Sequence, residues 1–198
     1  MFPIDFCHIP VSIIKRSAGR SAVAAAAYRS GTKLTNEWDG MTHDYTRKGG
    51  IVHAEIMLPA YAPPEFADRS ILWNSVEQIE KARDSQLARE IEAALPRELS
   101  REQQLALVRS YVKDNFVDKG MCADFAIHDK GTGNPHVHIM LTLRPLKENG
   151  QWVSRQFLFR RCCGGRYAPG FRHAQDSRLK YQPMPCAKQA HSLGCSSP

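Results

Sequence analysis

The sequence predicts an α+β fold, in which a central antiparallel sheet of about five strands carries helices mainly on one face. Five apolar segments have the length and alternation typical of strands, and three other segments have the start signals and apolar spacing of helices. Two of the strand segments are joined by a short turn rich in Gly and Pro, which favours antiparallel pairing. The strands are expected near residues 4–14, 51–58, 87–95, 121–127 and 136–143, and the helices near 21–30, 63–80 and 100–116.

The N-terminal part of the chain predicts a strand, a short helix and a polar connection. The helix at 21–30 is rich in alanine, the best helix former, and Gly31 stands where a C-terminal cap belongs. Its small side chains allow it to pack very close to a sheet. The polar stretch that follows, around Trp38, Gly40 and His43, is expected to form a hairpin or an arm.

The middle of the chain alternates strand and helix signals. Pro59 ends the strand at 51–58, and Pro63-Pro64 opens the next helix. After the strand at 87–95, the segment from Ser100 to Gln103 is a capping-box signature that starts the third helix.

A histidine cluster marks the last two strands. His136 and His138 alternate with apolar residues, so the period of a strand puts both imidazoles on one face. His128 ends the preceding strand, and the turn between the strands brings it opposite that pair. Three converging neutral imidazoles form a divalent-metal site with open coordination positions. His53 alternates with Glu55 on an earlier strand, where a structural role is expected rather than a fourth ligand.

An acidic pair on the strand at 87–95 is expected to support these histidines. Glu90 and Glu92 flank Ile91, so on a strand they share one face. Metal-bound histidines commonly donate their second N–H to a carboxylate. Spacing does not choose between the two, so both are candidate catalytic residues.

Tyr28 closes the alanine-rich helix within a basic stretch. Residues 15–48 contain seven Lys and Arg against three acidic residues. Such surroundings suit a phosphate backbone and help a phenol to ionise. The residues expected to bind DNA are Lys15, Arg16, Arg20, Arg29, Arg47 and Lys48.

Charge and cysteine distribution divide the chain into a domain at 1–150 and a tail at 151–198. The tail contains eight Lys and Arg against Asp176, so it carries the whole net charge of +7. It also holds four of the six cysteines, without the C-x₂-C pair of a zinc ribbon, and is expected to be disordered. The sequence contains no apolar run long enough to span a membrane, and its N-terminus lacks the pattern of a signal peptide. A cytoplasmic protein is therefore expected.

Two motifs together resemble the MobA/MobL relaxases, the plasmid-mobilisation members of the HUH endonucleases. They are GRSAVAAAAYRSG at residues 19–31 and AIHDKGTGNPHVHIML at 126–141, with supporting likeness in RKGGIVHAEIMLP and LAREIEAALPRELS. The resemblance covers roughly residues 1–148 and implies a central antiparallel sheet that carries the histidines. The tail departs from the family, which suggests a truncated or frame-shifted end.

The resemblance implies nicking of one DNA strand at an origin of transfer. Matched residue by residue, Tyr28 is the nucleophile that stays joined to the 5′ end, and His128, His136 and His138 are the metal ligands. Mg²⁺ or Mn²⁺ is the implied ion, although three imidazoles also suit Zn²⁺ or Ni²⁺. An acidic residue of the 89–95 segment would lie near the metal. The implied partners are single-stranded origin DNA, accessory mobilisation proteins and a coupling protein.

Two other functions stay open from the sequence alone. One is a metal-dependent nuclease of related fold that activates water, with a structural Tyr28. The other is a non-catalytic fragment that binds origin DNA.

Overall fold

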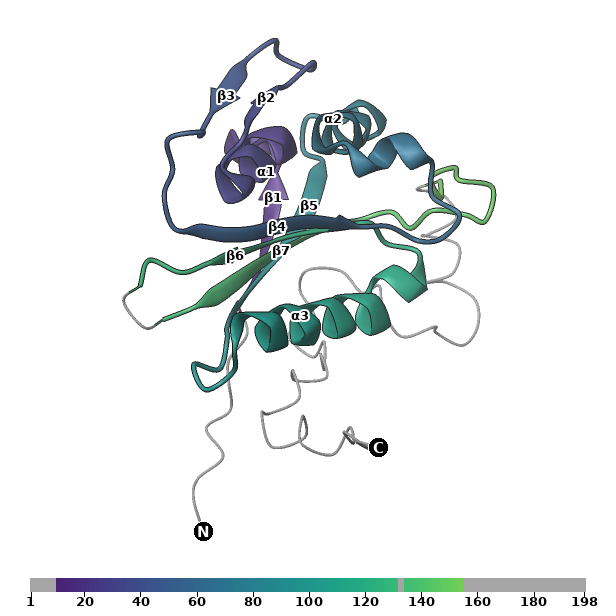
Figure 1. Cartoon of the computed structure of the whole chain (residues 1–198). Coiled ribbons are helices and arrows are strands. Elements are labelled where there is room, and N and C mark those ends of the chain that lie inside the picture. Colours follow the sequence, from purple (N-terminus) through teal and green to yellow (C-terminus); the bar gives the residue numbers. More distant parts are fainter. Residues whose placement is uncertain (1–9, 132–133, 155–198) are drawn as a thin grey trace.

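A computed structural model describes residues 10–131 and 134–154, and its centre is a five-stranded antiparallel sheet (Figure 1). The strand order is β1-β5-β7-β6-β4, and every neighbouring pair is antiparallel. The strands are β1 Val11–Lys15, β4 Ile51–Met57, β5 Gln86–Ala94, β6 Ala123–His128 and β7 His136–Thr142. The predicted sheet is therefore confirmed in class and strand number. Residues 4–9 of the first expected strand lie outside the described residues.

Helices cover both faces of the sheet, two on one face and one on the other. In Figure 1, α1 Ala22–Ser30 and α2 Arg69–Ile79 lie above the sheet, and α3 Arg101–Asn115 lies below it. The expectation that the helices lie mainly on one face is thus met by α1 and α2. The third helix takes the opposite face because the central strands are apolar on both sides, as all six buried residues of β6 show.

The two faces of the sheet bury separate apolar cores. On the α3 side, Phe125 and Ile139 pack with Val108 and Val112 of the helix. On the other side, Met140 and Ala88 pack with Val23 of α1 and with α2 residues such as Trp73. Side chains alternate along each strand, so a polar residue of β5 or β7 that stands between two residues of the α3-side core faces the α1 side.

Helix α1 forms where the sequence places it, and its ends are capped. The hydroxyl of Ser21 accepts a hydrogen bond from the Ala24 amide, and Gly31 takes the left-handed conformation at φ 65°. Ala22 and Ala26 are at most 1 % exposed, so their small side chains let the helix approach the sheet closely.

The expected helix at 63–80 is broken into two pieces. Residues Pro64–Ala67 form a 3-10 turn, and α2 begins only after Asp68. The carboxylate of Asp68 accepts a hydrogen bond from the Ile71 amide, so this residue caps the second piece instead of continuing the first. By contrast, the capping box of Ser100 and Gln103 forms as predicted.

The polar stretch after α1 is a two-stranded hairpin, as the sequence predicts. It consists of β2 Lys33–Thr35 and β3 Thr42–Asp44, which form a separate antiparallel pair. At its tip, the Trp38 ring lies 4.0 Å from the guanidinium carbon of Arg16. Two more short 3-10 helices, η1 Arg16–Ala18 and η3 Val117–Lys119, complete the connections.

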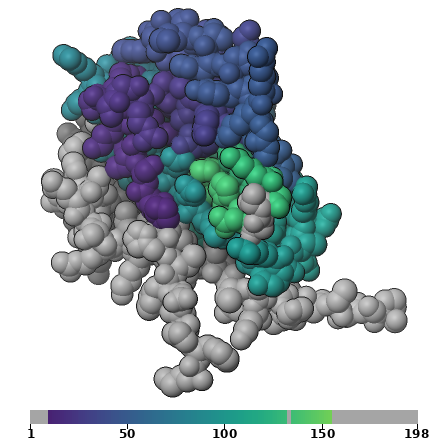
Figure 2. Space-filling view, turned by 90° about the vertical axis from the view of Figure 1, so that its left-hand side faces the viewer, coloured from purple at the N-terminus to yellow at the C-terminus, as the bar shows by residue number. Residues whose placement is uncertain are grey.

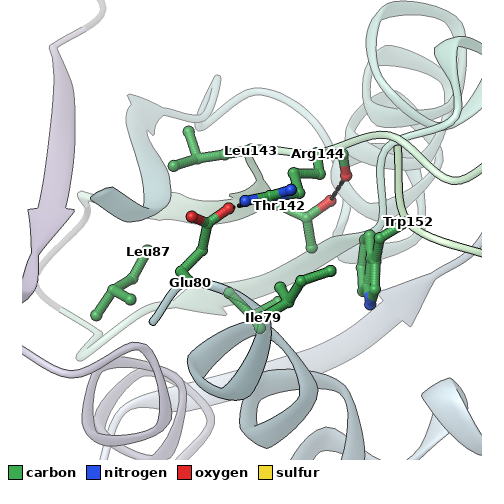
Figure 3. A pocket seen from close by; sticks show the side chains of 8 residues that line it. Ile79, Glu80, Leu87, Thr142, Leu143, Arg144 and Trp152 are labelled. Carbon is green, nitrogen blue, oxygen red and sulfur yellow. Dashed lines mark hydrogen bonds and ion pairs between the residues drawn. The ribbon is translucent and has the colours of Figure 1, made fainter. Parts of the chain in front are cut away.

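The described chain ends on the α2 side of the sheet. Trp152 stacks on Phe66 at 5.3 Å between ring centroids, just past the expected domain boundary at residue 150. Figure 3 shows a small pocket there, spanned by the ion pair of Glu80 and Arg144. The pocket adjoins Thr142, at the end of β7 opposite to the histidines. The predicted disordered tail lies, from residue 155 on, outside the described residues.

Within residues 10–131 and 134–154, none of the helices combines the length and the apolar character that crossing a membrane requires.

A buried ion pair joins η1, α1 and α2 and generates a stability prediction. The carboxylate of Glu77, 1 % exposed, accepts from the Ala22 amide at 2.7 Å and from Arg16 Nη2 at 2.7 Å. Glu77→Ala leaves the Ala22 amide without its acceptor and removes the carboxylate that balances the charge of Arg16, whose guanidinium keeps only carbonyl acceptors. We therefore expect a loss of about 3 kcal/mol in unfolding free energy. Chemical denaturation measures this loss. Asp118→Asn, which removes the exposed pair with Lys113, is the control and should barely shift the unfolding midpoint.

Candidate functional site

Three histidine side chains converge at one end of the sheet. His128 is the last residue of β6 and pairs directly with His136, the first residue of β7, while His138 lies opposite Ala126. One ligand nitrogen of each ring lies within 4.8 Å of the others, and the ring centroids are 4.8–5.5 Å apart. The sequence expectation that the three imidazoles meet across the hairpin is thereby met in the geometry. We call His128, His136 and His138 the histidine triad.

Hydrogen bonds fix the outer nitrogen of each ring of the triad. His128 Nε2 lies 2.7 Å from the Arg29 carbonyl oxygen, and His136 Nδ1 lies 3.0 Å from that of Asn134. His138 Nδ1 lies 3.3 Å from a carboxylate oxygen of Glu90. Because these oxygens only accept, each of the three nitrogens carries the proton and the other ring nitrogen keeps its lone pair. This is the arrangement that metal-binding histidines need.

His128 is held neutral by its surroundings. The side chain is buried, and burial lowers the pKa of His128 to about 4, with a further contribution from the positive charge of Lys48. A metal ion binds only the neutral imidazole, so His128 is ready to act as a ligand at neutral pH.

Glu90 is the carboxylate that contacts the triad. It lies on β5, between β1 and β7, and accepts hydrogen bonds from Ser12 at 3.1 Å and from Arg29 as well as from His138. Burial acts to raise the pKa of Glu90, but the hydrogen bonds of His138 and Arg29 outweigh it and hold the pKa at about 2. The carboxylate is therefore ionised throughout the neutral range.

Glu92 shares the face of Glu90 but lies at the margin of the site. Its side chain is 53 % exposed, and its Oε2 is 3.9 Å from His138 Nδ1. The sequence left both carboxylates open as supporting residues. In the structure Glu90 is the one of the two that lies within hydrogen-bond distance of His138.

Tyr28 lies in the last turn of α1 and directly precedes Arg29, whose carbonyl oxygen accepts the hydrogen bond from His128. Its side chain is 48 % exposed and accessible to a large substrate. The Tyr45 ring packs perpendicular to it, with 5.2 Å between centroids, and the ammonium of Lys48 lies 3.5 Å from the centroid of the Tyr28 ring. Figure 2 shows one face of the molecule, on which three segments lie near one another: the N-terminal segment (purple), the segment around residue 50 (blue) and the segment that includes β7 (green).

The residues expected to bind DNA divide into two groups. Arg16 and Arg29 are largely buried and paired within the fold, with Glu77 and Glu90 respectively. Arg20, 46 % exposed in its side chain, lies 3.9 Å from Glu90, at the edge of the site. Lys15 and Lys48 are partly exposed and Arg47 is exposed.

Lys130 is a basic residue of the site that sequence reasoning missed. It is exposed in the turn between β6 and β7, and its charge, with that of Arg29, lowers the pKa of Lys48 beyond the effect of burial. Its position two residues after His128, within the expected turn, was the signal that could have identified it.

His53 belongs to the opposite face of the sheet. Its Nε2 lies 2.8 Å from Glu55, whose carboxylate also binds Arg109 of α3, and its ring lies 5.9 Å from that of Phe125. It is therefore no fourth ligand. The triad is the one group of possible metal ligands among the described residues.

The chain has relatives among mobilisation and conjugal transfer proteins. The model of the MobA/MobL family matches residues 20–182. The chain is 49 % identical over 153 residues to a conjugal transfer protein TraA of Agrobacterium fabrum (strain C58 / ATCC 33970), which covers 72 % of this chain and 14 % of that protein. It is 39 % identical over 168 residues to mobilization protein MobL of Acidithiobacillus ferridurans, covering 72 % of this chain and 44 % of the relative. The chain thus spans less than half the length of these relatives.

A solved structure has a similar fold. The structure described as "Molecular Basis of Vancomycin Resistance Transfer in Staphylococcus aureus" superposes with a TM-score of 0.73 and 28 % identity. The match covers 88 % of this chain and 84 % of the other.

Metal titration tests the histidine triad. If the triad binds metal, His138→Ala removes one ligand, so the affinity of this variant for Mn²⁺ or Zn²⁺ should fall by more than the roughly 10- to 100-fold that losing an outer hydrogen-bond partner costs. Calorimetric titration of the full chain gives the affinity. His53→Ala, an equal deletion on the other face of the sheet, should bind metal as the wild type does. Equal loss in both variants would refute the assignment.

The lowered pKa of His128 predicts a pH dependence of stability. Between the ordinary value of 6.5 and about 4, the unfolded chain takes up a proton on His128 and the folded chain does not. The stabilising contribution is therefore complete above pH 6.5 and is lost as the pH falls toward 4. Denaturation in the presence of a chelator should show a steeper loss over this window for the wild type than for His128→Gln; parallel curves would contradict the pKa shift.

Proposed function

The chain belongs to the MobA/MobL family of mobilisation relaxases, and on that premise we propose that it nicks one DNA strand at an origin of transfer. The observation that carries the proposal is the link between the two halves of the site. The carbonyl group of Arg29, the residue after Tyr28, accepts a hydrogen bond of 2.7 Å from His128 of the triad. This hydrogen bond supports the proposal that the exposed phenol and the triad act in one site.

The proposed reaction is a phosphoryl transfer to Tyr28. The phenol loses its proton and its oxygen bonds to the scissile phosphorus, while the bond from phosphorus to the 3′ oxygen breaks and that oxygen takes up a proton. The products are a 5′-phosphotyrosyl strand and a free 3′ hydroxyl. One phosphoester replaces another, so the strand can be rejoined by the reverse reaction without a nucleotide cofactor.

Three neutral imidazoles fit a divalent metal ion, with Mg²⁺ or Mn²⁺ proposed and Zn²⁺ or Ni²⁺ as alternatives. When bound, such an ion neutralises a non-bridging phosphate oxygen and so favours attack by an anion. Imidazole nitrogens suit Zn²⁺ and Ni²⁺, whereas Mg²⁺ and Mn²⁺ prefer oxygen ligands, which the phosphate and water would have to supply.

Glu90 is proposed to position the triad rather than to touch the phosphate. Its carboxylate orients the His138 ring through Nδ1 and is itself fixed by Ser12 and Arg29. An ionised carboxylate next to the ring also makes the imidazole a stronger ligand. Glu92, being half exposed, is left as the less supported candidate for this role.

Single-stranded DNA beside a duplex stem or hairpin is the proposed substrate. A phenol on a short helix above the sheet end reaches a phosphate only when the strand is unpaired and can lie across the site. The basic groups available to the DNA backbone are the exposed and partly exposed ones, Lys15, Arg20, Arg47 and Lys130. Lys48, which the sequence also assigned to the DNA backbone, contacts the Tyr28 ring. Accessory mobilisation proteins, a coupling protein and a cytoplasmic location belong to the same proposal.

Substitution of the nucleophile tests the reaction. A pool of single-stranded oligonucleotides with a randomised segment is incubated with the full chain and Mn²⁺, and covalent adducts are isolated under denaturing conditions and sequenced. Tyr28→Phe should abolish the adduct and keep binding of the selected oligonucleotide within a few-fold, because the phenol supplies chemistry and the cations supply affinity. Tyr61→Phe should keep the adduct, since the Tyr61 hydroxyl donates to the Leu146 carbonyl oxygen, in the segment that follows β7.

Each rival function has its own result in this experiment. Cleavage by Tyr28→Phe without any adduct would indicate a nuclease that activates water. Binding without cleavage by the wild type would indicate a non-catalytic fragment. An adduct that survives Tyr28→Phe would move the nucleophile to Tyr45.

A further inference from the structure

Lys48 makes two contacts with the same residue, Tyr28. Its ammonium nitrogen lies 3.5 Å from the centroid of the phenol ring, within the range of a cation–π interaction. The same nitrogen donates a hydrogen bond of 2.8 Å to the Tyr28 carbonyl oxygen. One side chain therefore contacts both the ring and the backbone of the proposed nucleophile.

The hydrogen bond has a local cause in the end of α1. The last carbonyl groups of a helix lack partners within the helix, and a cation near them is favoured by the helix dipole. The Arg29 carbonyl accepts from His128, and the Tyr28 carbonyl accepts from Lys48. Lys48 and a member of the triad thus cap adjacent carbonyl groups of one helix end.

The segment that carries Lys48 is itself fixed on both sides of the site. The Lys48 amide donates to the Tyr45 carbonyl at 2.9 Å, and the Tyr45 amide donates to the Thr32 carbonyl at 3.2 Å, just after α1. Two residues beyond Lys48, the Gly50 carbonyl accepts from the Asp129 amide at 2.8 Å. The segment from Tyr45 to Gly50 therefore bridges the end of α1 and the turn after His128.

We propose that Lys48 is a positioning residue for Tyr28: its ammonium group, with the perpendicular Tyr45 ring, holds the phenol in the orientation that attacks the phosphate. The proposal rests on Tyr28 being the nucleophile. The ammonium is then committed to Tyr28, whereas the sequence assigned it to the DNA backbone.

The two roles of Lys48 predict different measurements. A contact with the DNA backbone contributes to affinity and to the salt dependence of binding, and it leaves the rate of adduct formation in the bound complex unchanged. A positioning contact contributes to the rate of attack, since a displacement of about 1 Å in a reacting group can cost about 100-fold. Lys130, exposed in the neighbouring turn, is the matched control for a cation that is free to bind phosphate.

The experiment compares variants of the full chain on an oligonucleotide selected by wild-type adduct formation. Lys48→Met should lower the single-turnover rate of adduct formation by about 10- to 100-fold, with the oligonucleotide affinity and its salt dependence unchanged within about twofold. Lys48→Arg should restore most of the rate, because guanidinium also binds aromatic faces. Lys130→Met should instead weaken binding and reduce the salt slope by about one.

Lower affinity of Lys48→Met with a normal rate at saturating oligonucleotide would overturn the proposal. So would failure of Lys48→Arg to restore the rate in a variant with a wild-type unfolding midpoint. A second variant, Tyr45→Leu, should lower the rate in the same manner as Lys48→Met, and a normal rate would count against the role of that ring.

A spectroscopic arm separates this proposal from the proposed function. In protein labelled with [ε-¹³C]lysine, the Lys48 methylene protons should be shifted upfield by the Tyr28 ring and should return to the range of the other lysines in Tyr28→Leu. An unshifted signal in the wild type would overturn the contact itself. A shifted signal in a wild-type chain that forms no adduct would confirm the contact between Lys48 and the Tyr28 ring but refute the proposed nicking. The positioning role of Lys48 would then be refuted as well.

Discussion

A single hydrogen bond, from Nε2 of His128 to the carbonyl oxygen of Arg29, joins the end of α1 to the end of β6. The last carbonyl groups of the helix need a hydrogen-bond donor, and the imidazole N–H needs an acceptor, so one bond satisfies both groups. It fixes which nitrogen of His128 is free to act as a ligand. It also sets the distance between the helix that carries Tyr28 and the sheet that carries the triad. The alanine side chains of α1 permit this approach, because larger ones would hold the helix away from the strands.

The buried carboxylate of Glu90 connects the same elements through charge. It accepts from Arg29 of α1, from Ser12 of β1 and from His138 of β7, and these hydrogen bonds keep it ionised despite its burial. The charge of the Arg29 guanidinium is balanced by the Glu90 carboxylate, so Arg29 is not a free cation for DNA. The remaining cations near Tyr28 lie on the rim of the site: Lys48 contacts the Tyr28 ring, and Lys130 is exposed and available to DNA. A site that looks uniformly basic in the sequence is thus divided into structural cations and available ones.

Most secondary structure was predictable because each element has local signals. Ser21 and Gly31 bound α1, the capping box starts α3, and the alternating histidines mark β7. The helix expected at 63–80 was the main departure, since Asp68 could read as a residue within a helix or as the cap of a new one. In the structure Asp68 has an extended backbone conformation and caps α2. The place of Arg16 was hidden for a similar reason, because its partner Glu77 is 61 residues away in the chain.

The sequence by itself determined the class of fold, the convergence of His128, His136 and His138, and the shared face of Glu90 and Glu92. These follow from the period of a strand and from a turn that returns the chain on itself, which are properties of neighbouring residues. The tertiary structure alone decided that Glu90 contacts the triad, that Arg16 and Arg29 are paired internally, and that Lys48 lies on the Tyr28 ring. These outcomes depend on the strand order β1-β5-β7 and on the docking of α1, which bring together groups far apart in the chain. Burial and partner choice are set by that packing, and no local pattern encodes them.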